Sequence, residues 1–125
     1  MMKAILIAAA VLLSGPALAQ HAHNNEKGPN GGPMEDLAGI HAELLVSGQV
    51  LTVNVFDEAG KPVDTAGYTG SAMIVSGSDR KTLPLAASGN ALTGQAAAPI
   101  ANGAVVTLVI RTAAGKSGHA KFSAP

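Results

Sequence analysis

From Ile40 onward, short runs of the chain alternate apolar and polar side chains. In one such run, Leu51, Val53 and Val55 occupy every second position, with polar residues between them. A period of two is typical of a half-buried β-strand, because successive side chains point to opposite faces. The pattern therefore predicts strands that each turn one apolar face toward a core.

Glycines and other turn residues separate these runs, and such punctuation between β-branched runs is typical of an all-β sandwich or barrel. We expect one all-β domain, a single seven-stranded antiparallel Greek-key sandwich of the immunoglobulin-like type. Ser47-Gly48 predicts a tight hairpin loop, and Pro84 predicts an edge strand because proline has no N–H to donate. The expected strands are residues 40–46, 49–57, 69–76, 81–85, 91–95, 104–112 and 117–123.

The alternation also predicts inward and outward positions near the C-terminus. Val106, Leu108 and Ile110 should face the core, as should Phe122, whereas His119 should face outward. With one Tyr and two Phe in the chain, the core should be mostly aliphatic.

The first residues follow a different pattern. A basic start is followed by an apolar run, Ala4 to Leu13, and then by small residues at Ala17 and Ala19. This is typical of a secretory signal peptide, and the run is too short for a membrane span, which takes roughly 20 residues. We predict that residues 1–19 are removed on export to the periplasm or the medium, leaving no membrane-spanning segment.

Residues 20–39 are polar and rich in Gly and Pro, so they predict a flexible arm that precedes a sandwich at residues 40–125. The eight Lys and Arg balance eight Asp and Glu, so no basic patch is predicted and nucleic acid is not an expected partner. The chain has no cysteine and no recognisable pairing of a nucleophile with a base. We therefore do not expect an enzyme.

Two histidines in the arm suggest a metal site. His21 and His23 are one residue apart, and imidazole binds zinc, copper and nickel. Cleavage after Ala19 would leave the new amine on Gln20, whereas further trimming would leave it on His21. Either amine could add a nitrogen ligand for Cu(II) or Zn(II). The alternative is that both histidines are ordinary polar residues of a solvated tail.

Three residues of the predicted sandwich form a weaker candidate. His41 and Glu43 share one face of the first expected strand, and His119 faces outward on the last. If those strands were neighbours, the three side chains could share a surface metal ion. Met34, Glu35 and Asp36 could approach that site from the arm. The alternative is that they are isolated surface residues, because a metal site needs several converging ligands.

Four segments recur in an order that resembles a known family. They are Gly28-Pro29-Asn30-Gly31-Gly32, His41-Ala42-Glu43-Leu44, Asp57-Glu58-Ala59-Gly60-Lys61-Pro62-Val63 and Gly89-Asn90-Ala91-Leu92-Thr93-Gly94. The order resembles the N-terminal β-sandwich domain of periplasmic adaptor (membrane-fusion) subunits of heavy-metal efflux pumps, and free-standing periplasmic proteins of that pattern. The resemblance implies a β-sandwich that takes part in handling copper, zinc or related ions. It supplies no ligand set, and the adaptors' coiled-coil hairpin is absent here.

Two functions remain open at this stage. The first is a periplasmic metal-binding accessory protein of heavy-metal efflux or resistance. It would hold a copper or zinc ion through His21 and His23, with His41, Glu43 and His119 as further candidates. The second is a ligand-free interaction module that docks on a periplasmic or efflux partner through its Pro84 edge or its glycine-rich arm.

Overall fold

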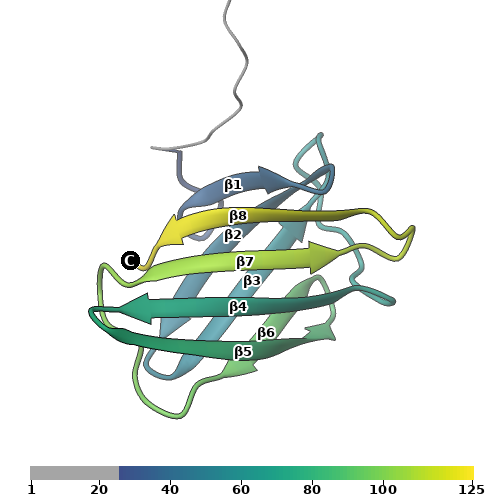
Figure 1. Ribbon diagram of the computed structural model, residues 1–125. Helices are drawn as coiled ribbons and strands as arrows, with labels where there is room; N and C mark the ends of the chain where they lie inside the picture. Colours follow the sequence, from purple (N-terminus) through teal and green to yellow (C-terminus); the bar gives the residue numbers. More distant parts are fainter. Residues whose placement is uncertain (1–25) are drawn as a thin grey trace, which may run out of the picture.

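The computed structural model describes residues 26–125, which form antiparallel β-strands joined by turns and loops. Figure 1 shows β4, β5, β7 and β8 across the front, with β2, β3 and β6 running obliquely behind them. The strands are β1 (Met34–Leu37), β2 (Ile40–Ser47), β3 (Val50–Phe56), β4 (Thr69–Ser76), β5 (Asp79–Ser88), β6 (Ala91–Gln95), β7 (Val105–Arg111) and β8 (Ser117–Ser123).

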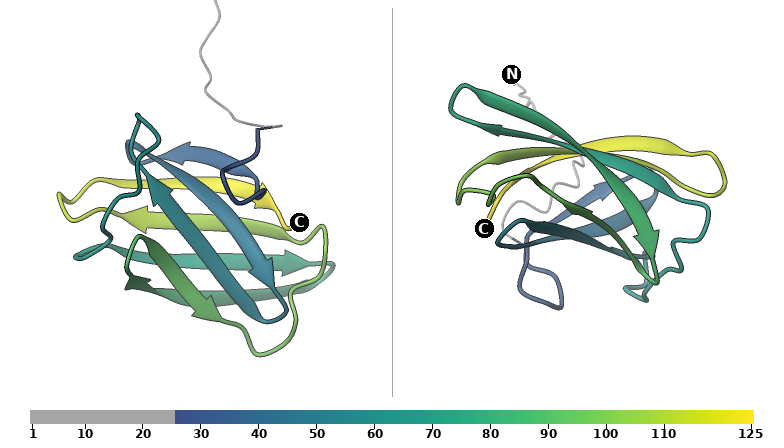
Figure 2. Two further views of the ribbon diagram at one scale, coloured as in Figure 1. Left: turned by 180° about the vertical axis from the view of Figure 1, so that it is seen from behind. Right: turned by 90° about the horizontal axis from the view of Figure 1, so that it is seen from below.

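The eight strands make one sheet in the order β1-β2-β3-β6-β5-β4-β7-β8. The two outer strands of this order, β1 and β8, lie side by side, so the sheet curls until it is nearly closed (Figures 1 and 2). Gly118 of β8 allows this approach, because a Cβ there would lie 2.5 Å from the backbone nitrogen of Ala38. The absence of a side chain at residue 118 therefore helps to bring the two edges together.

β5 contributes to both groups of strands, those across the front of Figure 1 and those behind them. Residues 79–85 pair with β4, whereas residues 86–88 pair with β6. Pro84 precedes this change of partner, and its carbonyl oxygen faces Gly94 of β6, which is the side away from β4. Because the N and O of one strand residue point to the same side, proline removes no bond to β4. The predicted edge therefore exists only around Pro84. In the strand order β5 lies between β6 and β4, but at Pro84 it pairs with β4 alone.

The core matches the alternation. All six inward positions that the sequence predicts on β3 and β7 are fully buried, and Phe122 of β8 is also buried. The tight hairpin predicted at Ser47-Gly48 is present, but its two turn residues are Gly48 and Gln49, because Ser47 is still part of β2 and pairs with Val50. Within residues 26–125 there is no helix with the length and apolar character needed to cross a membrane.

Two expectations about the architecture need correction. The fold is all-β and antiparallel, as predicted, but it has eight strands in one nearly closed sheet instead of seven in a Greek-key sandwich. The additional strand is β1, which lies inside the segment assigned to the arm and pairs with β2 through Met34↔Glu43 and Leu37↔Ile40. Its four residues, Met-Glu-Asp-Leu, place two acidic side chains together, so they show no apolar alternation.

Candidate functional site

The β1–β2 hairpin gathers most of the chemistry-bearing side chains that the structure describes. On β2, Ala42 and Leu44 face the core, so His41 and Glu43 share the outer face. Across the strand pair, Asp36 lies opposite His41 and Met34 lies opposite Glu43. Four functional side chains therefore occupy one small area outside the sheet.

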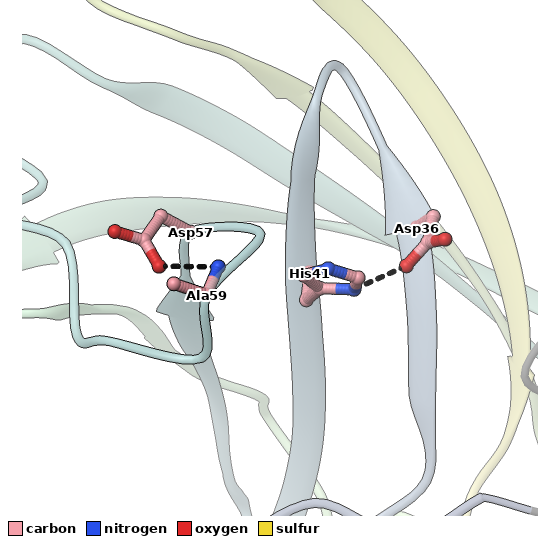
Figure 3. Close-up of polar contacts among 4 residues, drawn as sticks. All are labelled: Asp36, His41, Asp57 and Ala59. Carbon is pink, nitrogen blue, oxygen red and sulfur yellow. Dashed lines mark hydrogen bonds and ion pairs between the residues drawn. The ribbon is translucent and has the colours of Figure 1, made fainter.

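His41 is paired with Asp36. The distance between His41 Nδ1 and Asp36 Oδ1 is 2.5 Å, and the side chains are 22% and 31% exposed (Figure 3). Both atoms of the contact are buried from solvent. In neutral His41 an N–H at Nδ1 would donate to the carboxylate, which leaves the lone pair on Nε2. The pair can thus fix both the ring orientation and the tautomer.

His41 lines a hollow of about 240 Å³. The β1–β2 hairpin provides one wall, the segment before β1 a second, and the turn after β3 a third. Asp57 holds that turn, because its Oδ1 accepts hydrogen bonds from the backbone N–H groups of Ala59 and Lys61, both at 2.9 Å. Figure 3 shows the bond to Ala59. The residues that line this "His41 hollow" are Glu26, Pro29, Met34, His41, Phe56, Glu58, Ala59 and Gly60.

Glu43 is completely buried, although it lies on the outer face of β2. Its Oε2 accepts hydrogen bonds from the backbone N–H groups of Asn30 at 2.8 Å and Gly32 at 2.9 Å. Its Oε1 accepts one from Asn30 Nδ2 at 2.9 Å. All three partners are donors, which suits an ionised carboxylate, since that group only accepts. Among the described residues, Glu43 is the one charged side chain that is buried.

The loop that covers Glu43 comprises residues 26–33, which we call the cover loop. It closes on itself through two bonds, Gly28 N–H to Gly32 O at 2.7 Å and Gly31 N–H to Gly28 O at 3.0 Å. It also joins β2, because Leu44 N–H donates to Pro33 O at 3.0 Å. The cover loop is therefore attached to β2 in two ways, through a backbone hydrogen bond and through the side chain of Glu43.

The predicted ligands do not all come together. His119 faces outward on β8, as expected, but β1 lies between β8 and β2, so the strands that carry His119 and His41 are not neighbours. In residues 26–125, no three or more His, Cys, Asp or Glu side chains are grouped so that they could hold a metal ion. His21 and His23 lie outside the described residues.

A second hollow, of about 270 Å³, lies beside the one-sided part of β5. Ile74 and Leu83 supply apolar side chains from the sheet, and the loop at residues 96–101 forms the opposite wall. Asp79 and Lys81 add charge to its lining. We call it the β5 groove.

No protein-family model, curated protein or solved structure matches this chain. The resemblance to the efflux adaptor domain therefore remains a prediction. The structure does connect two of the segments that carry it: Asn30 and Gly32 of the first donate directly to Glu43 of the second.

Sequence reasoning missed two features of the site. Asp36 was expected only to approach this region from the arm, and its direct pairing with His41 was missed because β1 was not recognised as a strand. The burial of Glu43 depends on the cover loop. That loop has almost no apolar residue, so its sequence does not predict that it packs on the sheet. The available signal was the glycine-rich composition of Gly28 to Gly32, which allows backbone to approach a side chain closely.

Proposed function

We propose that this protein binds a transition-metal cation, copper or zinc, outside the cytoplasm, as an accessory protein of heavy-metal efflux or resistance. His41 would be the ligand from the sheet, and His21 and His23 would complete the site. The resemblance to the efflux adaptor domain supports a role in metal efflux or resistance. The geometry around His41 supports metal binding by its imidazole.

The observation that carries the proposal is the contact between His41 Nδ1 and Asp36 Oδ1 on the wall of the His41 hollow. A metal-binding histidine commonly donates its other ring N–H to a carboxylate, which fixes the tautomer and makes the ligating nitrogen more basic. Met34 lines the same hollow and offers a thioether, a soft donor that copper accepts in its reduced form.

A single imidazole is not a site, so further ligands are needed. Glu26 lines the His41 hollow, and His23 is three residues before it in the chain. Three residues of extended chain span at most about 11 Å, at about 3.6 Å per residue. A ligand three positions before Glu26 is therefore within the reach that the proposal requires.

The test is a competition titration of the exported protein with Cu(II) and with Zn(II), after its N-terminus has been determined by mass spectrometry. We expect one tight site, and at least tenfold weaker binding in His41→Ala and in the His21→Ala/His23→Ala double variant. His119→Ala is the matched control and should bind as the wild type does. Equal affinity in all four proteins would reject the assignment.

Acidification provides a second check of histidine ligation. A proton competes with the metal for the same imidazole nitrogen, so affinity should fall steadily as the pH is lowered from 7.5 to 5. An affinity that stays constant over this range would indicate ligands other than histidine.

An interaction module remains the alternative, and the one-sided pairing of β5 favours it. Thr82 has the same parity as Pro84, so its backbone groups also point away from β4, toward the β5 groove. An extended segment of a partner protein could add a strand there. A photo-crosslinking residue at position 82 would then trap a periplasmic efflux component in cells, and one at position 109 would not. Crosslinking that is equal at both positions would count against docking at β5.

A further inference from the structure

The β5 groove lies where the sheet divides between β5 and β6. Residues 86–88 of β5 pair with β6, whereas residues 79–85 pair with β4 alone. β6 in turn stays with β3 as far as Gln95, which pairs with Val50, and it runs obliquely to β5 (Figure 1). The two strands therefore separate, and the groove occupies the opening beside the first half of β5.

The wall opposite β5 is the loop at residues 96–101, which is fixed to the turn between β2 and β3. Ala96 N–H donates to Gln49 O at 2.8 Å, and Ile100 N–H donates to Gly48 O at 3.0 Å. These two bonds hold the loop on the β3 side of the opening. The groove is therefore built into the fold and has two walls.

The β5 wall is an open strand edge. Thr82 has the same parity as Pro84, so its backbone N–H and C=O point away from β4. Within residues 26–125, no strand pairs with β5 on that side at Thr82. A donor and an acceptor at the spacing of one strand residue are matched by another extended backbone. This edge favours a peptide over an apolar small molecule.

The side chains of the groove favour one kind of peptide. Leu83 and Ile74 are 9% and 8% exposed, so one part of the lining is apolar. Lys81 also lines the groove and is exposed, and Lys81 and Arg80 together outweigh the charge of Asp79. Opposite charges on directly opposed residues stabilise a strand pair. An incoming strand should therefore place an apolar residue opposite Leu83 and an acidic residue opposite Lys81.

The two walls also favour a free segment over a second copy of this chain. A second copy would present its β5 edge together with its own β4, a further strand spacing of about 4.8 Å. The loop at residues 96–101 stands across the groove from β5, so a single extended segment fits the opening better.

We propose that the β5 groove binds an extended peptide segment, antiparallel to β5, with an apolar residue opposite Leu83 and an acidic residue opposite Lys81. The antiparallel direction is that of β6, which pairs on the same side of β5. Thr82 would exchange two backbone hydrogen bonds with the residue opposite it. The inference rests on the docking alternative and not on metal binding, since the β5 groove and the His41 hollow share no lining residue.

The test titrates the acetylated and amidated peptide Ser-Thr-Val-Thr-Glu-Thr-Ser into the exported protein and follows the backbone amides by NMR. In the proposed register its Val lies opposite Leu83, its central Thr opposite Thr82 and its Glu opposite Lys81. We expect saturable shifts that are largest at the Thr82 amide and in residues 96–101. An absence of saturable shifts at millimolar peptide would overturn the proposal.

Thr82→Pro tests the strand pairing, because it removes the donor that faces the groove and, as at Pro84, no bond to β4. It should bind the peptide at least tenfold more weakly than the wild type. Thr82→Ala is the matched control, which keeps the donor and should bind within twofold of the wild type. If Thr82→Pro does not fold, N-methylation of the peptide's central Thr removes the reciprocal bond and should cause the same loss. Equal binding with and without these donors would overturn strand addition.

Lys81→Glu tests the charge. It should weaken binding of the Glu peptide at least threefold, and a peptide with Lys in place of that Glu should restore the loss. Equal affinity of the wild type for the two peptides would overturn the acidic preference. If crosslinking at position 82 still traps a partner in cells, docking stands and only the chemistry proposed for the bound segment fails. Zn(II) binding is measured separately, so its failure leaves the peptide result unaffected.

Discussion

The outer faces of β2 and β7 differ in a way that polarity alone does not predict. On β2 the outward Glu43 is 0% exposed, whereas on β7 the outward Val109 is 45% exposed. A charged residue is thus buried and an apolar one is in solvent, although both lie on the outside of the same sheet. The difference is the cover loop, which lies over β2 and supplies three hydrogen-bond donors to Glu43.

This contrast shows that alternation identifies the core side of a strand but not the environment of its other side. A buried carboxylate is tolerated only where donors replace the water it loses. The outer face of β2 satisfies that condition through Asn30 and Gly32. We therefore expect substitutions there to have structural and functional effects, and substitutions on the outer face of β7 to have almost none.

The largest effect should come from Glu43→Ala. The substitution leaves three donors without their acceptor, so we expect a loss of about 3 kcal/mol in the free energy of unfolding. Urea denaturation of the variant and the wild type measures this loss. A decrease below about 1 kcal/mol would mean that water replaces the carboxylate at little cost, and that the loop is only loosely attached.

Gly28→Ala should cost about 2 kcal/mol, because its new methyl group would be forced against the Glu43 side chain. The same substitution in a Glu43→Ala background should cost much less, since the clash is then removed. A double-mutant cycle with urea denaturation measures this coupling. Additive losses would show that the two residues do not constrain one another.

Asp36→Asn separates stability from binding. Because Asp36 and His41 are partly exposed, we expect a stability change of only about 0.5 kcal/mol. Under the proposed function, metal affinity should nevertheless fall about tenfold, since the carboxylate would no longer fix the imidazole proposed as a ligand. Thermal melts and a Zn(II) titration give the two values. Unchanged affinity would remove Asp36 from the site.

The smallest effect should come from Val109→Thr on the outer face of β7. The side chain is exposed and lies opposite His119 on β8, so the change in unfolding free energy should stay within about 0.5 kcal/mol. Metal affinity should not change. A loss of more than about 1 kcal/mol would indicate that this face is covered in solution.

Most of the sheet could be predicted from the sequence, because apolar alternation is strong wherever one face meets the core. It identified the seven strands from β2 to β8, and it placed Val53 and Leu108 correctly inside. It failed at β1, where two acidic residues, Glu35 and Asp36, interrupt any apolar pattern. That strand is stabilised by pairing with β2 and by contact with β8. The sequence of β1 itself predicts neither contact.

The candidate site was only partly predictable for the same reason. His41 was identified from its residue type, and its face of β2 followed from alternation. Its pairing with Asp36 and the enclosure of Glu43 depend on contacts between segments. No local pattern encodes such contacts. The separation of His119 from His41 likewise depends on the order of the strands.

The most direct test follows the imidazole nitrogens of His41 and His119 by NMR while Zn(II) is added to the exported protein. We predict that the His41 Nε2 resonance shifts and saturates at one equivalent of zinc, together with those of the arm histidines, while His119 stays unchanged. If His41 does not shift, or if His41 and His119 respond equally and without saturation, the proposed metal site is contradicted.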